Sequence, residues 1–167
     1  SARLAVVPQA RHSAQMFAGV KSLSWSMNLC WNEMAQARGF DEALLLDEKG
    51  DVSECTSANI FIAQGGRVLT PPLTSGCLPG VTRDVLLRDI RVRGVSIEER
   101  ELRLSDLEAA DEVFITSTTR NLLPVSSVEG LQLKAGDTPV CRSLGEAFAA
   151  YVSAYAGARA GAARGTD

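Results

Sequence analysis

The order of the short apolar runs constrains the fold of this 167-residue chain more than any other feature of its sequence. Runs at 43–46, 59–63 and 67–69 are separated by two segments, 48–51 (EKGD) and 64–66 (QGG), that have the composition of turns. Runs of this length, joined by connections this short, predict a three-stranded antiparallel meander.

Segments with helical periodicity lie before and after this meander. Residues 22–38 carry apolar side chains three and four positions apart, and Gly39 is placed to end the predicted helix. Pro71 and Pro72 break the last strand, and a second helix is predicted to begin near Thr82 and to close at Gly94. The sequence further predicts a strand over 95–104, a helix start at 105–108, a strand over 112–115 and a final helix over 143–155.

This order of elements indicates the fold class. Strands that come first as a meander, followed by helices interleaved with single strands, depart from the regular alternation of a doubly wound sheet. We therefore expect one α+β domain over residues 1–155, built on a curved, mostly antiparallel sheet with flanking helices. Residues 156–167 are rich in Ala, Gly and Arg and are expected to form a flexible tail.

Composition excludes several classes of partner. A hydrophobic content of 46% is enough for one buried core, and the net charge of −3 is spread over interspersed acidic and basic residues, so nucleic acid is not expected as a partner. No apolar run approaches the roughly 20 residues that span a bilayer, and residues 1–9 lack the features of a signal peptide. We expect a cytoplasmic protein without a membrane partner.

Cysteine and histidine usage narrows the chemistry further. The four cysteines are widely spaced, without a C-x-x-C pair, and His12 is the only histidine, so neither disulfides nor a metal site are expected. A nucleophile activated by histidine would have to use His12, which is predicted to lie in a polar stretch ahead of the first ordered element.

Four features carry candidate chemistry, and each also has an ordinary structural explanation. Lys21 precedes the first helix but could be a solvated surface lysine, and Glu54 lies in a polar connector between two apolar strands, where an exposed loop glutamate is the simpler interpretation. Residues 78–83 (LPGVTR) lead a tight turn into a helix N-terminus, which is either an anion site or an ordinary helix start. Residues 116–119 (TSTT) offer hydroxyl groups that could hold phosphate or carboxylate oxygens, or could simply end a strand.

The joint order of these features resembles a known family. From Lys21 to about Gly130 the chain is similar to the class IV aminotransferases, which include branched-chain aminotransferase, D-amino-acid aminotransferase and aminodeoxychorismate lyase. The matching pieces are 20–23, 33–46, 53–61, 70–72, 78–83, 110–114 and 124–125. The resemblance implies the C-terminal domain of a fold-type-IV enzyme, a pseudo-barrel that binds pyridoxal 5'-phosphate.

The resemblance also implies roles for individual residues. Lys21 corresponds to the lysine that forms the Schiff base with the cofactor and moves the proton at the substrate α-carbon. Glu54 corresponds to the carboxylate that faces the pyridine nitrogen. The remaining cofactor contacts correspond to Leu78, Val81, Thr82 and Thr118, and the substrate contacts to Thr118 and Thr119.

Two departures from the family pattern qualify these roles. Ser24-Trp25 stands where many members have an Asn-Tyr pair, so the usual tyrosine hydrogen bond to the cofactor has no counterpart. The family's smaller N-terminal domain, which supplies a phosphate-binding arginine, has no counterpart here either, and we expect the chain to be a fragment of a two-domain enzyme that forms homodimers.

Three functional hypotheses remain open on the sequence. The first is amino transfer between an amino acid, preferably of the branched-chain type, and a 2-oxo acid. The second is 4-amino-4-deoxychorismate lyase activity, which releases pyruvate and 4-aminobenzoate. The third is an isolated domain without activity.

Overall fold

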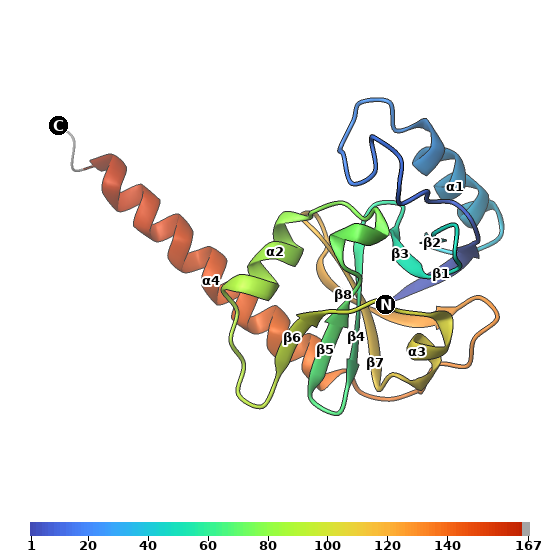
Figure 1. Ribbon diagram of the computed structural model, residues 1–167. Coiled ribbons are helices and arrows are strands. Elements are labelled where there is room, and N and C mark those ends of the chain that lie inside the picture. Colours follow the sequence, from blue (N-terminus) through green and yellow to red (C-terminus); the bar gives the residue numbers. More distant parts are fainter. Residues whose placement is uncertain (165–167) are drawn as a thin grey trace.

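The computed structural model describes the backbone of residues 1–164 and the side chains of residues 1–158, and its centre is one eight-stranded sheet (Figure 1). The strand order is β3-β2-β1-β8-β7-β4-β5-β6, with four antiparallel and three parallel neighbouring pairs in the described chain. The sheet is curled into a half-barrel with flanking helices, which confirms the predicted α+β class and its curved, mostly antiparallel sheet. The strands are β1 Ala2–Val7, β2 Glu42–Leu46, β3 Val52–Cys55, β4 Asn59–Gln64, β5 Arg67–Thr70, β6 Ser96–Glu99, β7 Glu112–Ser117 and β8 Asn121–Val128.

The predicted three-stranded meander is wrong, because a fourth strand lies inside it. Strand β3, whose polar residues Ser53 and Glu54 favoured a connector, is buried along its whole length and pairs with β2. Strands β4 and β5 form a separate hairpin, and four strands stand between β2 and β5 in the sheet order. Hydrogen bonding of Ser53 and Glu54 inside the protein removes the cost that would otherwise keep such residues at the surface.

Strand β1 was also missed, although it lies near the middle of the sheet. It runs parallel to β2 on one side and to β8 on the other, and Ala2, Leu4 and Ala5 are buried. His12 therefore follows an ordered strand instead of preceding all of them. Both partners of β1 lie far along the chain, so no local turn signal marks this strand.

The predicted helices are all present, with shifted ends, and one short helix, η1 Leu73–Ser75, was not predicted. Helix α1 spans Ser26–Ala37, inside the predicted 22–38, and α2 spans Val81–Arg88, ending well before Gly94. Two short helices, η1 Leu73–Ser75 and α3 Leu104–Ala109, precede α2 and β7, respectively. Helix α4, Pro139–Arg164, exceeds the predicted 143–155 at both ends: the expected tail is helical as far as Arg164, and residues 165–167 lie outside the described part of the chain.

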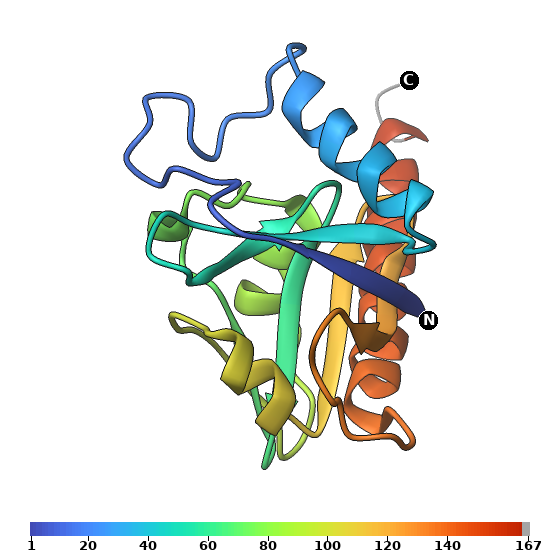
Figure 2. The ribbon, with the colours of Figure 1, turned by 90° about the vertical axis from the view of Figure 1, so that its right-hand side faces the viewer.

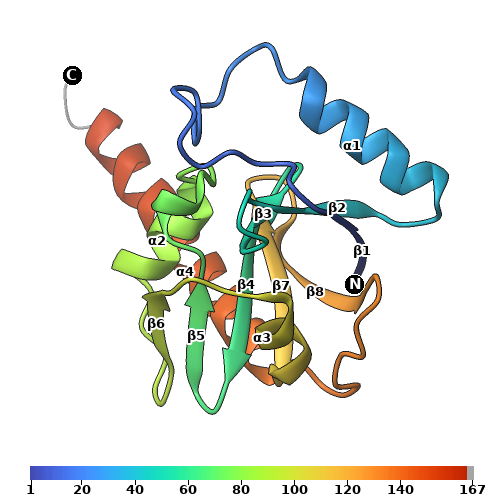
Figure 3. The ribbon, with the colours of Figure 1, turned by 45° about the vertical axis from the view of Figure 1, so that its right-hand side comes forward.

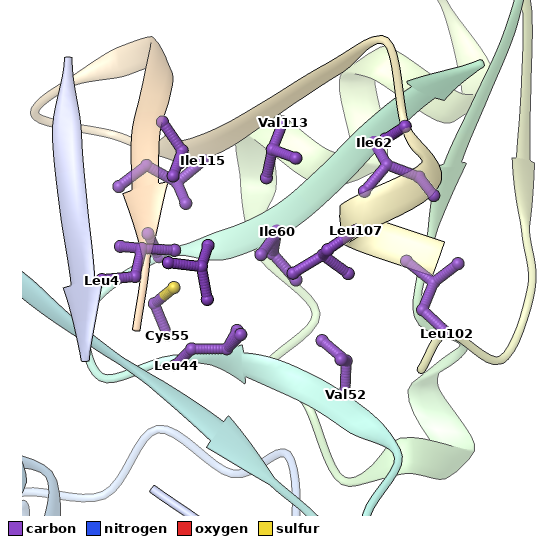
Figure 4. Close-up of a cluster of buried hydrophobic side chains, with 14 of the residues drawn as sticks. Leu4, Leu44, Val52, Cys55, Ile60, Ile62, Leu102, Leu107, Val113 and Ile115 are labelled. Atoms are coloured by element: carbon purple, nitrogen blue, oxygen red, sulfur yellow. The ribbon is translucent and has the colours of Figure 1, made fainter. Parts of the chain in front are cut away.

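Three apolar clusters hold these elements together. The largest fills the concave side of the half-barrel, where Leu4, Leu44, Ile60, Ile115 and Leu107 point toward one another (Figure 4). A second cluster packs α2 and α4 against the opposite face of β4 and β7, and a third packs α1 against β1 and β2 (Figure 2). None of the helices in the described residues is long and apolar enough to cross a membrane.

A buried carboxylate fixes the start of α4. Glu112, at the first position of β7, accepts the backbone N–H groups of Val140 and Cys141, both at 2.8 Å. These are among the N–H groups that a helix leaves without a partner in its first turn, and a negative charge there also interacts favourably with the helix dipole. The contact anchors the longest helix to the centre of the sheet.

Cysteine reactivity provides a test of this packing. Burial raises the pKa of the Cys55 and Cys77 thiols, and burial together with the nearby Glu112 raises the pKa of Cys141 to about 12, whereas Cys30 is exposed. The thiolate is the reactive form, so brief iodoacetamide treatment at pH 8 should alkylate Cys30 alone. Four modified cysteines are expected after denaturation, and rapid native alkylation of any of the other three, read by peptide mass spectrometry, would contradict the packing.

Candidate active site

One end of the half-barrel gathers the ends of several elements. The first residue of β4, Asn59, pairs with Thr116 near the end of β7, and β3 ends four residues before β4 begins. The loop that precedes α1, the segment leading into α2 and the β7–β8 turn all lie at this same end (Figure 3). Residues from distant parts of the sequence therefore meet here.

The loop carrying Lys21 is held in place by backbone hydrogen bonds to Gly76, in the segment leading into α2, and to Leu46. The N–H of Gly19 donates to the carbonyl of Gly76 at 3.0 Å, and the N–H groups of Ala10 and Arg11 donate to Leu46 at the end of β2, both at 3.0 Å. Lys21 is exposed. Burial raises the pKa of the Glu54 carboxyl, and the positive charge of Lys21 is the smallest of the effects that oppose this rise. The loop thus places an accessible amine within electrostatic range of a buried acid.

Glu54 is the buried acid at the centre of this arrangement. It is 5% exposed, and its two carboxylate oxygens accept separate hydrogen bonds, one from Arg11 Nη2 at 2.6 Å and one from the N–H of Leu78 at 3.0 Å. Burial raises the pKa of Glu54, while Arg11, Leu78 and Lys21 oppose that rise. The simpler of the two interpretations, an exposed loop glutamate, is therefore wrong: Glu54 is a buried strand residue held by charge-assisted hydrogen bonds.

The start of α2 leaves backbone N–H groups free of side-chain caps. Gly80 is the N-cap residue and makes no capping contact, while Val81 is exposed and Thr82 is buried. Asn59 Nδ2 donates to the Leu78 carbonyl at 2.8 Å, and its Oδ1 occupies the space that a Cβ on residue 80 would need. A Cβ at position 80 would require Asn59 to shift, so glycine lets the turn lie close to Asn59, and the first N–H groups of α2 carry no side-chain cap.

The β7–β8 turn presents hydroxyl groups at the same end. Thr118 and Thr119 are exposed, and the backbone N–H of Arg120 donates to Ser117 Oγ at 3.2 Å. One residue before Ser117, Thr116 is buried, and its Oγ1 has no hydrogen-bond partner among the described residues. The turn therefore carries hydroxyl groups available to oxygen-rich ligands.

One polar cluster at this end was not found from the sequence. Glu42, at the first position of β2, is 1% exposed and accepts hydrogen bonds from the hydroxyls of Thr56 and Ser57 and from Arg120 Nη1. Glu42 and Arg120 are 78 residues apart, and no spacing pattern links them. An acidic residue directly ahead of the apolar run 43–46 was the one available signal, and it resembles an ordinary strand start.

The other sequence-based expectations at this end concern His12, Trp25 and metals. His12 is exposed, and Trp25 lies directly before α1 with 39% of its surface exposed. In the described part of the chain, His, Cys, Asp and Glu side chains form no group of three that could hold a metal ion. The candidate functional groups at this end are an amine, a buried carboxylate, a helix start without a side-chain cap and several hydroxyls.

Comparisons with a family model, with curated proteins and with solved structures all match this chain to aminotransferases. Residues 1–128 match the family described as amino-transferase class IV. The chain is 37% identical over 115 residues to branched-chain-amino-acid aminotransferase of Escherichia coli strain K12, covering 68% of this chain and 37% of that protein, and 37% identical over 117 residues to D-alanine aminotransferase of Bacillus licheniformis, covering 70% and 41%. The crystal structure of branched-chain amino acid aminotransferase from Thermobaculum terrenum, in its PLP form, superposes with a TM-score of 0.81 and 28% identity, over 91% of this chain and 51% of that one.

The packing of Asn59 against Gly80 can be tested by mutation. We expect Gly80→Ala to lower the free energy of unfolding by about 1–3 kcal/mol, because the new methyl group overlaps Asn59 Oδ1. Asn59→Ala removes that oxygen, so Gly80→Ala should cost clearly less in an Asn59→Ala background. The control is Gly145→Ala on α4, where a Cβ meets nothing within 4 Å and no loss is expected. Additive costs of the two changes at positions 59 and 80, measured by urea unfolding, would contradict the contact.

Proposed function

The chain belongs to the class IV aminotransferases, and from this premise we propose that it carries the pyridoxal-phosphate-binding part of an enzyme that moves amino groups between an amino acid of the branched-chain type and a 2-oxo acid. The observation that supports this proposal is the position of Glu54. Its carboxylate accepts a hydrogen bond from the turn that leads into α2 and interacts electrostatically with Lys21. The chain spans about two fifths of the length of the curated relatives it matches, so the activity is proposed for the enzyme that contains it.

The residues present fit pyridoxal phosphate. The group needs an amine for its aldehyde, a negative charge for its ring nitrogen and an anion site for its phosphate. Lys21 offers an exposed amine and Glu54 a buried carboxylate. The start of α2, which follows Gly80, offers N–H groups without a side-chain cap. Thr116 Oγ1, which is buried without a partner among the described residues, adds a polar atom whose hydrogen bond a ligand can complete.

We assign the phosphate to the N-terminus of α2 and the β7–β8 turn. The free N–H groups of Val81 and Thr82 and the positive end of the helix dipole attract a dianion, and Thr118 supplies a hydroxyl. Leu78 lies in the turn that leads to these groups and would pack against the ring. The N–H of Thr119 and the Thr118 hydroxyl would hold the substrate carboxylate.

Lys21 and Glu54 have different roles in the proposed reaction: Lys21 binds the cofactor and transfers a proton, and Glu54 supplies a fixed negative charge. When bound, pyridoxal phosphate acts as an electron sink for the bond-breaking step at the substrate α-carbon. Lys21 holds the cofactor through its Nζ and then moves the proton at the α-carbon, a role that needs a mobile, accessible amine. Glu54 holds a negative charge at a fixed place because Arg11 and the Leu78 N–H restrain both of its oxygens.

Exposed apolar side chains on the loop before α1 and on α1 itself support a covering partner. Met16 is 88% exposed, Phe17 71%, Leu23 107% and Met27 60%, and they lie on the segment that flanks Lys21. Apolar surface of this kind marks an interface more often than a free face. We propose that the N-terminal domain implied by the family, and a second subunit, cover it.

The proposed reaction is tested with substrates. The complete enzyme that contains this chain, supplied with pyridoxal phosphate, should convert leucine and 2-oxoglutarate to 4-methyl-2-oxopentanoate and glutamate. Lys21→Ala should abolish this conversion, while Lys49→Ala in the exposed β2–β3 turn leaves it unchanged. Pyruvate release from aminodeoxychorismate, without glutamate formation from leucine, would replace the proposal with the lyase reaction. Absence of both reactions would support a domain without activity.

Glu54 should matter more for the rate than for cofactor affinity. We expect Glu54→Gln to lower kcat roughly 100-fold, because the charge that faces the ring nitrogen is lost while the amide oxygen still accepts the Leu78 N–H. The dissociation constant of pyridoxal phosphate, measured by absorbance, should change much less, because the phosphate contacts are unaffected. The control is Glu98→Gln, at an exposed position of β6. An unchanged kcat together with lost cofactor binding would contradict this role.

A further inference from the structure

Arg120 is held in a fixed orientation at the same end of the sheet. It directly follows Thr118 and Thr119, and its Nη1 donates to Glu42 Oε2 at 2.7 Å and to Ser57 Oγ at 3.1 Å. The Glu42 side chain is 1% exposed and the Arg120 side chain 37%, so the ion pair runs from the interior to the surface. The Glu42 carboxylate also accepts hydrogen bonds from the hydroxyls of Thr56 and Ser57, so it is itself restrained, and it restrains the guanidinium that it binds.

A short chain of contacts connects Arg120 to the candidate active site. Ser57 lies in the loop between Glu54 and Asn59, and these two residues bind, respectively, the N–H and the carbonyl group of Leu78. The Glu42 ion pair therefore joins the β7–β8 turn to the loop that holds the start of α2. Arg120 directly follows Thr118 and Thr119, the residues assigned above to phosphate and carboxylate.

Half of this guanidinium remains available for a ligand. A guanidinium carries five N–H donors, and every side-chain hydrogen bond of Arg120 within the described residues goes through Nη1. The remaining edge, formed by Nε and Nη2, presents two parallel N–H bonds, which is the geometry that binds a carboxylate through both oxygens. The neighbouring arginines are committed elsewhere: Arg11 binds Glu54, and buried Arg83 binds the Pro71 carbonyl and Glu99.

The need to neutralise the Glu42 charge does not by itself explain why an arginine stands at position 120. Two hydroxyl groups and one nitrogen of Arg120 already satisfy the Glu42 carboxylate. A lysine could supply the same charge, but only arginine adds a second pair of N–H donors in a fixed, planar arrangement. The unused edge therefore needs its own explanation.

We propose that the free edge of Arg120 binds a carboxylate of the substrate amino acid or oxo acid, and that Glu42 is the positioning residue for this contact. The inference rests on the proposed function and deepens it by assigning a specificity determinant. The bound group is either the carboxylate that every substrate carries at its α-carbon or the distal carboxylate of a dicarboxylic substrate such as glutamate.

The test uses two carboxylate probes and calorimetry, with and without pyridoxal phosphate. Glutarate carries two carboxylates and 4-methylvalerate carries one. Arg120→Lys keeps a positive charge near Glu42 but lacks the two-donor edge, so it should raise the dissociation constant of glutarate roughly 10- to 100-fold at unchanged thermal stability. Equal weakening of 4-methylvalerate binding assigns Arg120 to the α-carboxylate, and weakening of glutarate alone assigns it to the distal carboxylate.

Matched variants separate positioning from general stabilisation. Glu42→Gln should weaken the same probe, and the double variant Glu42→Gln/Arg120→Lys should bind it no more weakly than Arg120→Lys alone, because Glu42 acts through Arg120. Arg3→Lys alters the exposed ion pair with Asp41, next to Glu42, and should leave binding unchanged.

Two outcomes would overturn the inference: wild-type affinity of Arg120→Lys for both probes, and failure of the wild-type protein to bind either of them. Failure of the proposed function would show separately, as absence of an absorbance band from bound pyridoxal phosphate.

Discussion

The contact between the buried Glu54 carboxylate and the Leu78 N–H is the interaction on which the arrangement of the candidate site depends. An unpaired carboxylate in this position would cost several kcal/mol, so the protein must bring donors to it. One donor, Arg11, comes from the loop that carries Lys21, and the other, Leu78, comes from the turn that opens α2. Satisfying one buried charge thus draws the amine and the anion site to the same strand end.

Two other strands of the half-barrel begin with a buried carboxylate that also accepts hydrogen bonds from neighbouring segments. Glu42 at the start of β2 binds the β3–β4 loop and the β7–β8 turn, and Glu112 at the start of β7 binds the first turn of α4. Each carboxylate is at most 6% exposed and accepts hydrogen bonds from at least two separate groups. Apolar packing holds the middle of the sheet, and buried acids fix the loops at its ends, where ligands have access.

The sequence was sufficient to predict the elements whose signals are local. The positions of α1 and α2 follow from helical periodicity, and those of β4 and β5 from apolar runs separated by a glycine-rich turn. No local turn signal marks β1, whose two parallel partners are distant in sequence, and the polar residues of β3 favour a connector over a strand. At the site, Lys21 and Glu54 became informative only through their order along the chain and the family it resembles. The pairing of Glu42 with Arg120 depends on tertiary structure, and neither residue could have been assigned to a site from the sequence alone.

Borohydride reduction of the protein mixed with pyridoxal phosphate tests the central claim most directly. If the Glu54 contacts place Lys21 in a cofactor site, reduction should fix one pyridoxyl group on the tryptic peptide that contains Lys21, and Lys49 and Lys134 should stay unmodified. Modification spread over several exposed lysines, or none at Lys21, would contradict the account, because the same amine would then be an ordinary surface group. Peptide mass spectrometry distinguishes the two results.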